Sequence, residues 1–206
     1  MADQEMNTIF DFDGAGNTPL TPEDAAQLIP SLATREELNE FEGRNILEAR
    51  RWALNKRVMT TRDPLDEIYL RELHRRMFDQ TSKWAGTYRK TDLNFGCPFA
   101  EIYQRIPVLL GNVRYWIERR TFELDEIAVR YHYQLVWEIH AFPNGNGRHA
   151  RMIADVLAVQ RGRPAFTWGQ INPGVAGAAR EQYLAAMRAL DADEKNIKPL
   201  LEFARS

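Results

Sequence analysis

The sequence of 206 residues contains a single cysteine, Cys97, which excludes an internal disulfide framework and favours a reducing compartment. No apolar run reaches the roughly 20 residues of a membrane span, and the N-terminus lacks the basic and apolar regions of a signal peptide. The formal net charge of −2 supplies no general field for nucleic acid or an anionic membrane. We therefore expect a cytoplasmic protein with no nucleic-acid or membrane partner.

Helical periodicity is the pattern that this sequence shows most clearly. Hydrophobic residues make up 44% of the chain and charged residues 27%, which suits a single domain over residues 1–206 that begins with a polar lead-in over 1–30. Beyond the lead-in, apolar residues recur at three- and four-residue steps. They predict an all-α fold with helices over 34–58, 64–78, 101–119, 124–142, the stretch after PNGNG, 178–190 and a short segment from 199. Residues 86–99 alternate loosely and are the only strand candidate, as a short hairpin.

The stretch HAFPNGNGRHAR, which begins at His140, is unsuited to a helix interior, since each interior glycine costs about 1 kcal/mol relative to alanine. It is predicted to form the turn before a helix, where unpaired backbone N–H groups attract phosphate. Gly145 and Gly147 allow an anion to approach the backbone, and Arg148 and Arg151 carry forked guanidinium groups that suit phosphate oxygens. A neutral His140 beside bound phosphates could accept a hydroxyl proton. The stretch thus predicts a site that holds a polyphosphate and activates an alcohol.

Taken one at a time, these elements also have ordinary structural explanations, because helix-ending histidines are commonly caps and GNG is a common turn. Together they match HxFx(D/E)GNGRxxR, the motif of the Fic family, at every position except one. The segments ATREELNEFE, ELHRRMFDQTSKWAGTYRKTDLN, DEIAVRYHYQLVWEIHAFPNGNGRHARMIADVL and LLEFARS resemble the Fic subgroup called mobile mystery protein B over nearly the whole chain. The resemblance implies a Fic-type helical bundle with a small β-hairpin, called the flap. It also implies transfer of AMP from ATP to a hydroxyl side chain of a target protein, which includes the chain itself as a candidate.

The resemblance also implies roles for individual residues. His140 would be the general base on the target hydroxyl, and Phe142 would anchor the loop in the core. Phosphates would be bound by the amides around Gly145, Asn146 and Gly147, with the Asn146 side chain on the α-phosphate, Arg148 on the β-phosphate and Arg151 on the γ-phosphate. The flap would hold the target segment by strand addition. Its residues are Thr87, Tyr88, Arg89, Lys90, Thr91, Asp92, Leu93 and Asn94.

The one departure from the motif is Asn144, which stands where the family usually has an aspartate or glutamate that holds Mg²⁺. An amide oxygen can ligate Mg²⁺ but brings no charge, whereas proteins usually hold this ion through carboxylates together with substrate phosphates. We therefore expect weak metal binding in the absence of ATP, or slow turnover.

A second family feature lies near the N-terminus. In Fic proteins a helix with (S/T)xxxE(G/N) reaches into the ATP site, and its glutamate pairs with the second motif arginine. The chain reads LNEFEG, with Leu38 in place of Ser or Thr, followed by Glu42 and Gly43. The resemblance implies that a helix over about 34–43 is inhibitory, with Glu42 beside Arg151 and Gly43 at a close approach between elements. The alternative is a solvated Glu42 and a break between two helices at Gly43.

Three functions remain open from the sequence. The first is AMP transfer, restrained internally or by a separate antitoxin-like protein. The second is transfer of another phosphate-containing group on the same fold, although the intact GNG favours AMP. The third is a nucleotide-sensing or protein-binding module without turnover, which Asn144 makes plausible.

Overall fold

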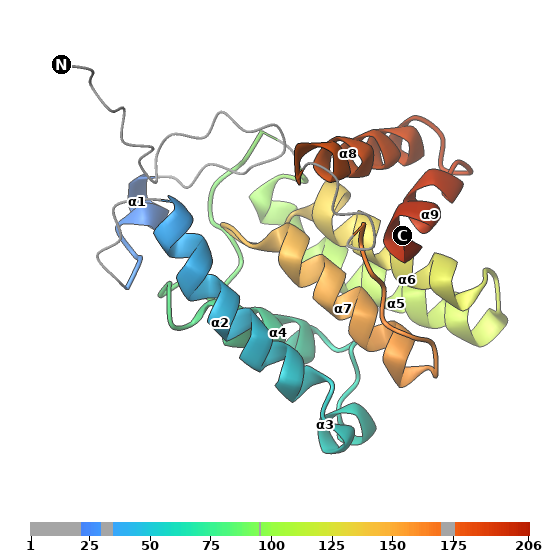
Figure 1. The fold of residues 1–206 in the computed structure, drawn as a ribbon, viewed down its shortest axis with the longest axis horizontal. Helices are drawn as coiled ribbons and strands as arrows, with labels where there is room; N and C mark the ends of the chain where they lie inside the picture. The colour runs from blue at the N-terminus through green and yellow to red at the C-terminus, as the bar shows by residue number, and fades with distance from the viewer. Residues whose placement is uncertain (1–21, 30–34, 95, 170–175) are drawn as a thin grey trace.

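The computed structural model describes residues 22–29, 35–94, 96–169 and 176–206, most of which are helical. Most of the predicted polar lead-in, and residue 34 at the start of the first predicted helix, lie outside the described residues. The all-α prediction is confirmed. In chain order the elements are α1 (Pro22–Ala25), α2 (Arg35–Ala53), α3 (Lys56–Thr61), α4 (Glu67–Phe78), η1 (Phe99–Glu101), α5 (Ile102–Arg119), α6 (Leu124–Tyr133), η2 (Gln134–Ile139), α7 (Asn146–Gln160), α8 (Ala176–Ala192) and α9 (Lys198–Arg205) (Figure 1).

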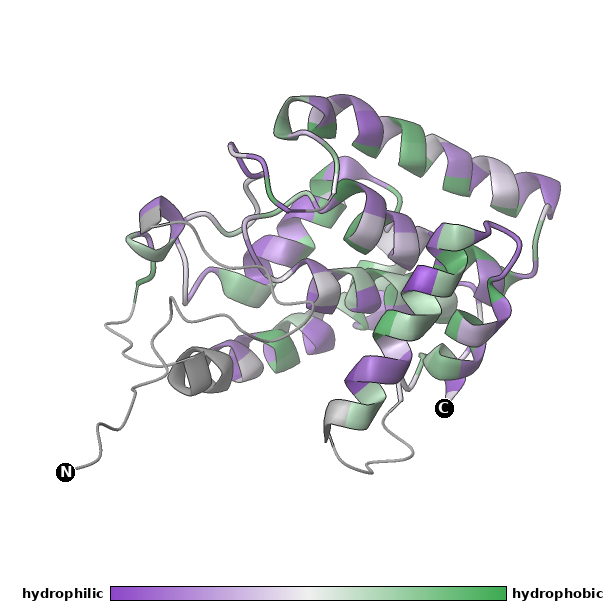
Figure 2. Ribbon diagram, turned by 90° about the horizontal axis from the view of Figure 1, so that it is seen from above, coloured by the Kyte–Doolittle hydropathy of each residue, from purple (hydrophilic) through white to green (hydrophobic). Residues whose placement is uncertain are grey.

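The helices pack in pairs around a shared apolar core. α2 lies along α4, α6 along α7, and α8 beside α9, while α7 runs between the α2 side and the α8 side (Figure 1). Hydrophobic and hydrophilic residues alternate along most helices (Figure 2), as expected for helices that bury one face. Side chains with no exposed surface include Leu70, Leu73, Ile106, Val113 and Ile153.

The predicted helix over 34–58 is two helices in the structure, because α2 ends at Ala53 and α3 begins at Lys56. Asn55 separates them with an extended backbone at φ −65° and ψ 135°. Its side chain accepts a hydrogen bond of 2.9 Å from the backbone N–H of Arg57. Asparagine is among the best residues for this N-cap position, so a local capping interaction starts the second helix.

The predicted buried helix over 124–142 changes its winding before it ends. α6 continues into η2, a π-helix, and the backbone N–H of His140 donates to the carbonyl of Leu135 at 3.0 Å. Such wide turns are rare and commonly occur at functional sites. Here the wide turn leads directly into the motif loop, which we define as residues 140–147, from the end of η2 into the first turn of α7.

The predicted β-hairpin is absent from the structure. Residues 87–94 form no strand, and the one β-bridge among the described residues joins Leu28 to Ser82 elsewhere. The reason lies in the hydrogen bonds of Arg89, whose backbone N–H donates to the carbonyl of Ala141 at 2.9 Å. The segment therefore pairs with the motif loop at this point and not with a second strand of its own.

Within the described residues, no helix combines the length and the hydropathy that crossing a membrane requires.

Candidate functional site

The motif loop is buried almost throughout, since every residue from 139 to 146 has little exposed surface. His140 and Gly145 both have left-handed backbones, with φ of 52° and 79°. A left-handed conformation is uncommon for a residue with a side chain. The loop therefore needs other contacts to hold His140 in this conformation.

His140 has one ring nitrogen whose role the structure determines. Nδ1 lies 2.8 Å from the carbonyl oxygen of Val136, which can only accept, so Nδ1 donates a proton. The neutral ring then carries its lone pair on Nε2. Burial lowers the pKa of His140 to about 4, and the charge of Arg89 acts in the same direction. The imidazole is therefore neutral at pH 7, as a general base must be before it accepts a proton.

Asn146 closes the loop with two hydrogen bonds to a single residue. Its Nδ2 donates to the carbonyl of Phe142 at 2.7 Å, and its Oδ1 accepts from the N–H of Phe142 at 2.9 Å. The Phe142 ring is buried and stacks on His74 with 3.7 Å between ring centroids. Phe142 thus anchors the loop as expected. The Asn146 amide, expected on a phosphate, is instead engaged with the backbone of the loop.

The two glycines of the loop differ in their surroundings. A Cβ on Gly145 would lie 2.4 Å from the ring of Phe78, and its φ of 79° also disfavours a side chain. A Cβ on Gly147 would meet nothing closer than Val136 at 3.9 Å. Packing therefore requires glycine at 145. No contact among the described residues requires it at 147, at the start of α7, where the helix N-terminus attracts anions.

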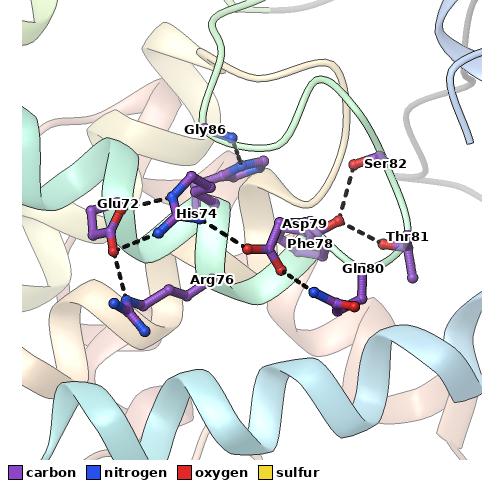
Figure 3. A network of polar contacts seen from close by, with 10 residues as sticks. Glu72, His74, Arg76, Phe78, Asp79, Gln80, Thr81, Ser82 and Gly86 are labelled. Atoms are coloured by element: carbon purple, nitrogen blue, oxygen red, sulfur yellow. Dashed lines mark hydrogen bonds and ion pairs between the residues drawn. The ribbon is translucent and has the colours of Figure 1, made fainter. Parts of the chain in front are cut away.

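His74, which no pattern in the sequence singled out, supports the loop from α4. Its Nε2 donates to the carbonyl of Asn144 at 3.0 Å, and its Nδ1 accepts from the N–H of Gly86 at 2.9 Å (Figure 3). Burial holds the pKa of His74 well below its usual range, which keeps the ring neutral for both bonds. In sequence, a single histidine on the apolar face of a helix has no distinguishing mark.

The two motif arginines point to different neighbours. Nη1 of Arg148 lies 2.5 Å from Oε2 of Glu42, an ion pair without hydrogen-bond geometry, and its guanidinium covers the ring of Phe78 at 5.1 Å. Arg151 covers the ring of Tyr183 in α8 at 5.9 Å. Among the described residues no carboxylate lies within ion-pair distance of Arg151.

The predicted partner of Glu42 was therefore wrong. Glu42 pairs with the first arginine, Arg148, because the second, Arg151, extends from α7 toward α8. The alternative of a solvated Glu42 is also excluded, since this residue is only 2% exposed. The expected close approach at Gly43 is wrong too, because this glycine is exposed and a Cβ on it would meet nothing within 4 Å.

Asn144 does not offer a ready metal ligand. Its Oδ1 accepts from the N–H of Gly145 at 2.5 Å, and its Nδ2 is buried without a partner. No cluster of three histidine, cysteine or acidic residues that could hold a metal ion occurs in the part of the chain that the structure describes. The donors present therefore do not fit a resident Mg²⁺.

The predicted flap residues divide into two groups. Tyr88 and Arg89 are buried, so neither side chain is available to a bound target. Residues 90–92 and 94 are exposed, while Thr87 and Leu93 are partly buried. A target side chain could therefore meet the exposed side chains from residue 90 onward or the partly buried Thr87, but not those of Tyr88 and Arg89.

Comparison with known proteins finds a matching family model and a similar curated protein. The family model described as "Fic/DOC family" matches residues 64–158, which include α4 to α6, the motif loop and all but the end of α7. The curated "Protein adenylyltransferase Fic" of Culex quinquefasciatus is 25% identical over 172 residues, which are 82% of this chain and 32% of that protein. The chain thus spans about a third of the length of that relative.

Solved Fic domains share the fold. The N-terminal FIC domain of Bep8 from Bartonella sp. 1-1C matches with a TM-score of 0.64 and 17% identity, covering 87% of this chain and 90% of that one. An N-terminal Fic domain from Bartonella quintana, solved with bound ADP, matches with a TM-score of 0.59 and 19% identity, covering 87% and 88%. The family model thus matches the part of the chain that contains the motif, residues 64–158, and the chain shares the fold of these Fic domains.

Proposed function

We propose that this chain is a protein adenylyltransferase that moves AMP from ATP to a hydroxyl side chain of a target protein. The observation that carries the proposal is the position of His140, a neutral base. It lies in the buried loop that leads into the N-terminus of α7, the helix that carries Arg148 and Arg151. Two relatives support it. One is named an adenylyltransferase, and another was solved with bound ADP.

In the proposed reaction, Nε2 of His140 accepts the proton of the target hydroxyl as its oxygen attacks the α-phosphorus. A new P–O bond forms, the bond between the α-phosphorus and the bridging oxygen breaks, and pyrophosphate leaves. The N–H groups at the start of α7 and the guanidinium groups of Arg148 and Arg151 would stabilise the charge on the phosphates. Arg151 suits this role because it has no carboxylate partner among the described residues. Since the donors at Asn144 do not fit Mg²⁺, no step here depends on a resident metal ion.

The proposal includes inhibition by Glu42. Its carboxylate occupies Arg148, the arginine that the family resemblance assigns to the β-phosphate. A nucleotide that binds there must displace Glu42 and break its ion pair with Arg148, in which the carboxylate is buried. Loss of the carboxylate should therefore strengthen ATP binding about tenfold, which corresponds to about 1.4 kcal/mol. We accordingly expect the cancelling substitution at Arg148 and not at Arg151.

The test incubates the purified chain with ATP labelled at the α- or the γ-phosphate and identifies the products by mass spectrometry. Self-modification that carries only the α label supports AMP transfer. Transfer of the γ label indicates phosphate transfer instead, and binding of ATP without transfer by any variant indicates a nucleotide-sensing module. His140→Ala should abolish transfer but still bind ATP. Full transfer by that variant would remove His140 from its proposed role.

Inhibition is tested with a matched pair of variants. Glu42→Gln should raise both ATP affinity and self-labelling, whereas Glu48→Gln, an exposed position on the same helix, should change neither. Adding Arg148→Ala should cancel the gain. If the wild type already labels itself and Glu42→Gln labels itself to the same extent, internal inhibition is refuted. A separate antitoxin-like protein then becomes the candidate inhibitor.

A further inference from the structure

Arg89 is a buried cation that lacks a buried carboxylate. The residue is 3% exposed, and its nearest acidic atom is Oδ1 of Asp92, 3.7 Å from Nη1 on a side chain that is 65% exposed. A buried charge is costly unless hydrogen bonds satisfy it. The burial of this guanidinium therefore indicates a specific function for its donors.

Backbone carbonyls supply those hydrogen bonds. Nε donates to the carbonyl of His140 at 2.8 Å and Nη1 to that of Thr91 at 2.7 Å. Nη2 donates to the carbonyls of Cys97 and Ile139. With its own backbone N–H on Ala141, Arg89 binds three consecutive residues where η2 ends. The last carbonyls of a helix have no partner within it, and here Arg89 donates to that of Ile139, which also accepts from the N–H of Cys97, and to that of His140 just beyond the helix.

The conformation of His140 explains why such a clamp is needed. Its backbone is left-handed, at φ 52° and ψ 60°, which costs free energy unless the surroundings impose it. Gly96 lies against it so closely that a Cβ there would be 2.6 Å from the Cβ of His140. Arg89 holds the carbonyl of His140 while Val136 binds its ring, so both ends of the residue are fixed.

We propose that Arg89 is the positioning residue of the reaction, because its clamp on the end of η2 holds the His140 imidazole in the orientation and tautomer that a general base needs. The inference rests on the proposed function, since it assigns His140 as the base. Arg89 thus acts inside the protein, and not on the target as a flap residue would. Only a guanidinium has the planar fork of donors that reaches these carbonyls together. A lysine ammonium keeps the charge but is a single compact donor.

The test compares Arg89→Lys with Arg71→Lys. Arg71 is a suitable control because its Nε donates to the carbonyl of Gly86 at 3.0 Å and its guanidinium covers Tyr88, with no bond to His140. In Arg89→Lys, kcat for self-labelling with α-labelled ATP should fall at least about tenfold, while the KM for ATP stays within about twofold. Arg71→Lys should change neither. Arg89→Gln, which loses the charge as well, serves as the second variant if Arg89→Lys does not fold.

Imidazole NMR of His140 gives a readout that needs no activity. In wild type the ring should be the Nδ1–H tautomer, and in Arg89→Lys it should become a mixture of both tautomers. A wild-type kcat and an unchanged tautomer in the lysine variant would overturn the clamp while leaving the proposed function intact. If no variant transfers AMP but the tautomer still changes, the proposed function fails and the clamp stands.

Discussion

The motif loop and the exposed part of α2 differ in how firmly the protein holds them. Residues 140–146 are buried, and the side chains of His74, Arg89 and Asn146 bond to the backbone of the loop. In α2, residues 43–48 are exposed or only partly buried, while Glu42 reaches the site through one ion pair. A loop held by several hydrogen bonds, next to a helix that reaches it through one ion pair, is the arrangement that the proposed releasable inhibition requires.

Acid should break this contrast with the largest effect, because the histidines that it protonates include His140 in the loop and His74 bonded to the loop, and none lies in α2. All four histidines of the chain have lowered pKa values, about 4 for His140 and His149, about 3 for His132, and well below normal for His74. The unfolded chain binds protons near pH 6.5 and the folded chain does not. The contribution of the four histidines to the free energy of unfolding is therefore complete above pH 6.5. It is lost as the pH falls toward 4, at up to about 5 kcal/mol per pH unit.

Urea unfolding between pH 7.5 and 4.5 measures this loss, and hydrogen exchange locates it. We expect the urea midpoint to fall steeply below pH 6.5, with amides of the motif loop losing protection before those of the packed end of α2. A midpoint that stays level down to pH 5 would show that the histidines do not hold the loop in their neutral forms.

Replacing each of the two loop glycines by alanine should show which glycine is needed for stability and which for ATP binding. Gly145→Ala forces a Cβ to 2.4 Å from Phe78 and strains a positive φ, so the free energy of unfolding should fall by about 3 kcal/mol. Gly147→Ala should leave stability within about 0.5 kcal/mol, because nothing lies near its Cβ. Thermal unfolding and ATP titration of both variants check this. Weaker ATP binding by a fully stable Gly147→Ala is the expected result, and unchanged binding would argue against a phosphate at that amide.

The smallest effect should come from stiffening α2. Gly43 is an exposed helix position with no neighbour within 4 Å, so Gly43→Ala should stabilise the helix by about 0.5–1 kcal/mol and lower self-labelling with ATP. Gly111→Ala on α5 is the matched control, because that glycine is also exposed and also has no neighbour. The control should gain similar stability without a change in labelling. Equal labelling by both variants would mean that the stiffness of α2 does not affect the site.

The local sequence pattern predicted most helices and the motif. It did not predict where a distant segment forms hydrogen bonds with the backbone. The alternation in residues 86–99 resembles a hairpin, yet the hydrogen bonds of Arg89 go to Ala141 and its neighbours, about fifty positions away. The apolar periodicity of residues 124–142 likewise continues through η2 and gives no sign of the π-helix, because a π-helix retains much the same apolar pattern. Neither outcome could be read from neighbouring residues.

The sequence by itself determined the helices, through apolar residues at helical spacing, and the chemistry of the motif, through two histidines, two glycines and two arginines within twelve positions. The tertiary structure alone decided which partner each of these groups meets. It directed Glu42 to Arg148 and Arg151 to Tyr183, engaged Asn146 with Phe142, and brought His74 and Arg89 to the loop. The physical reason is that helix spacing is a local property of the backbone, whereas a partner is fixed by how whole helices pack.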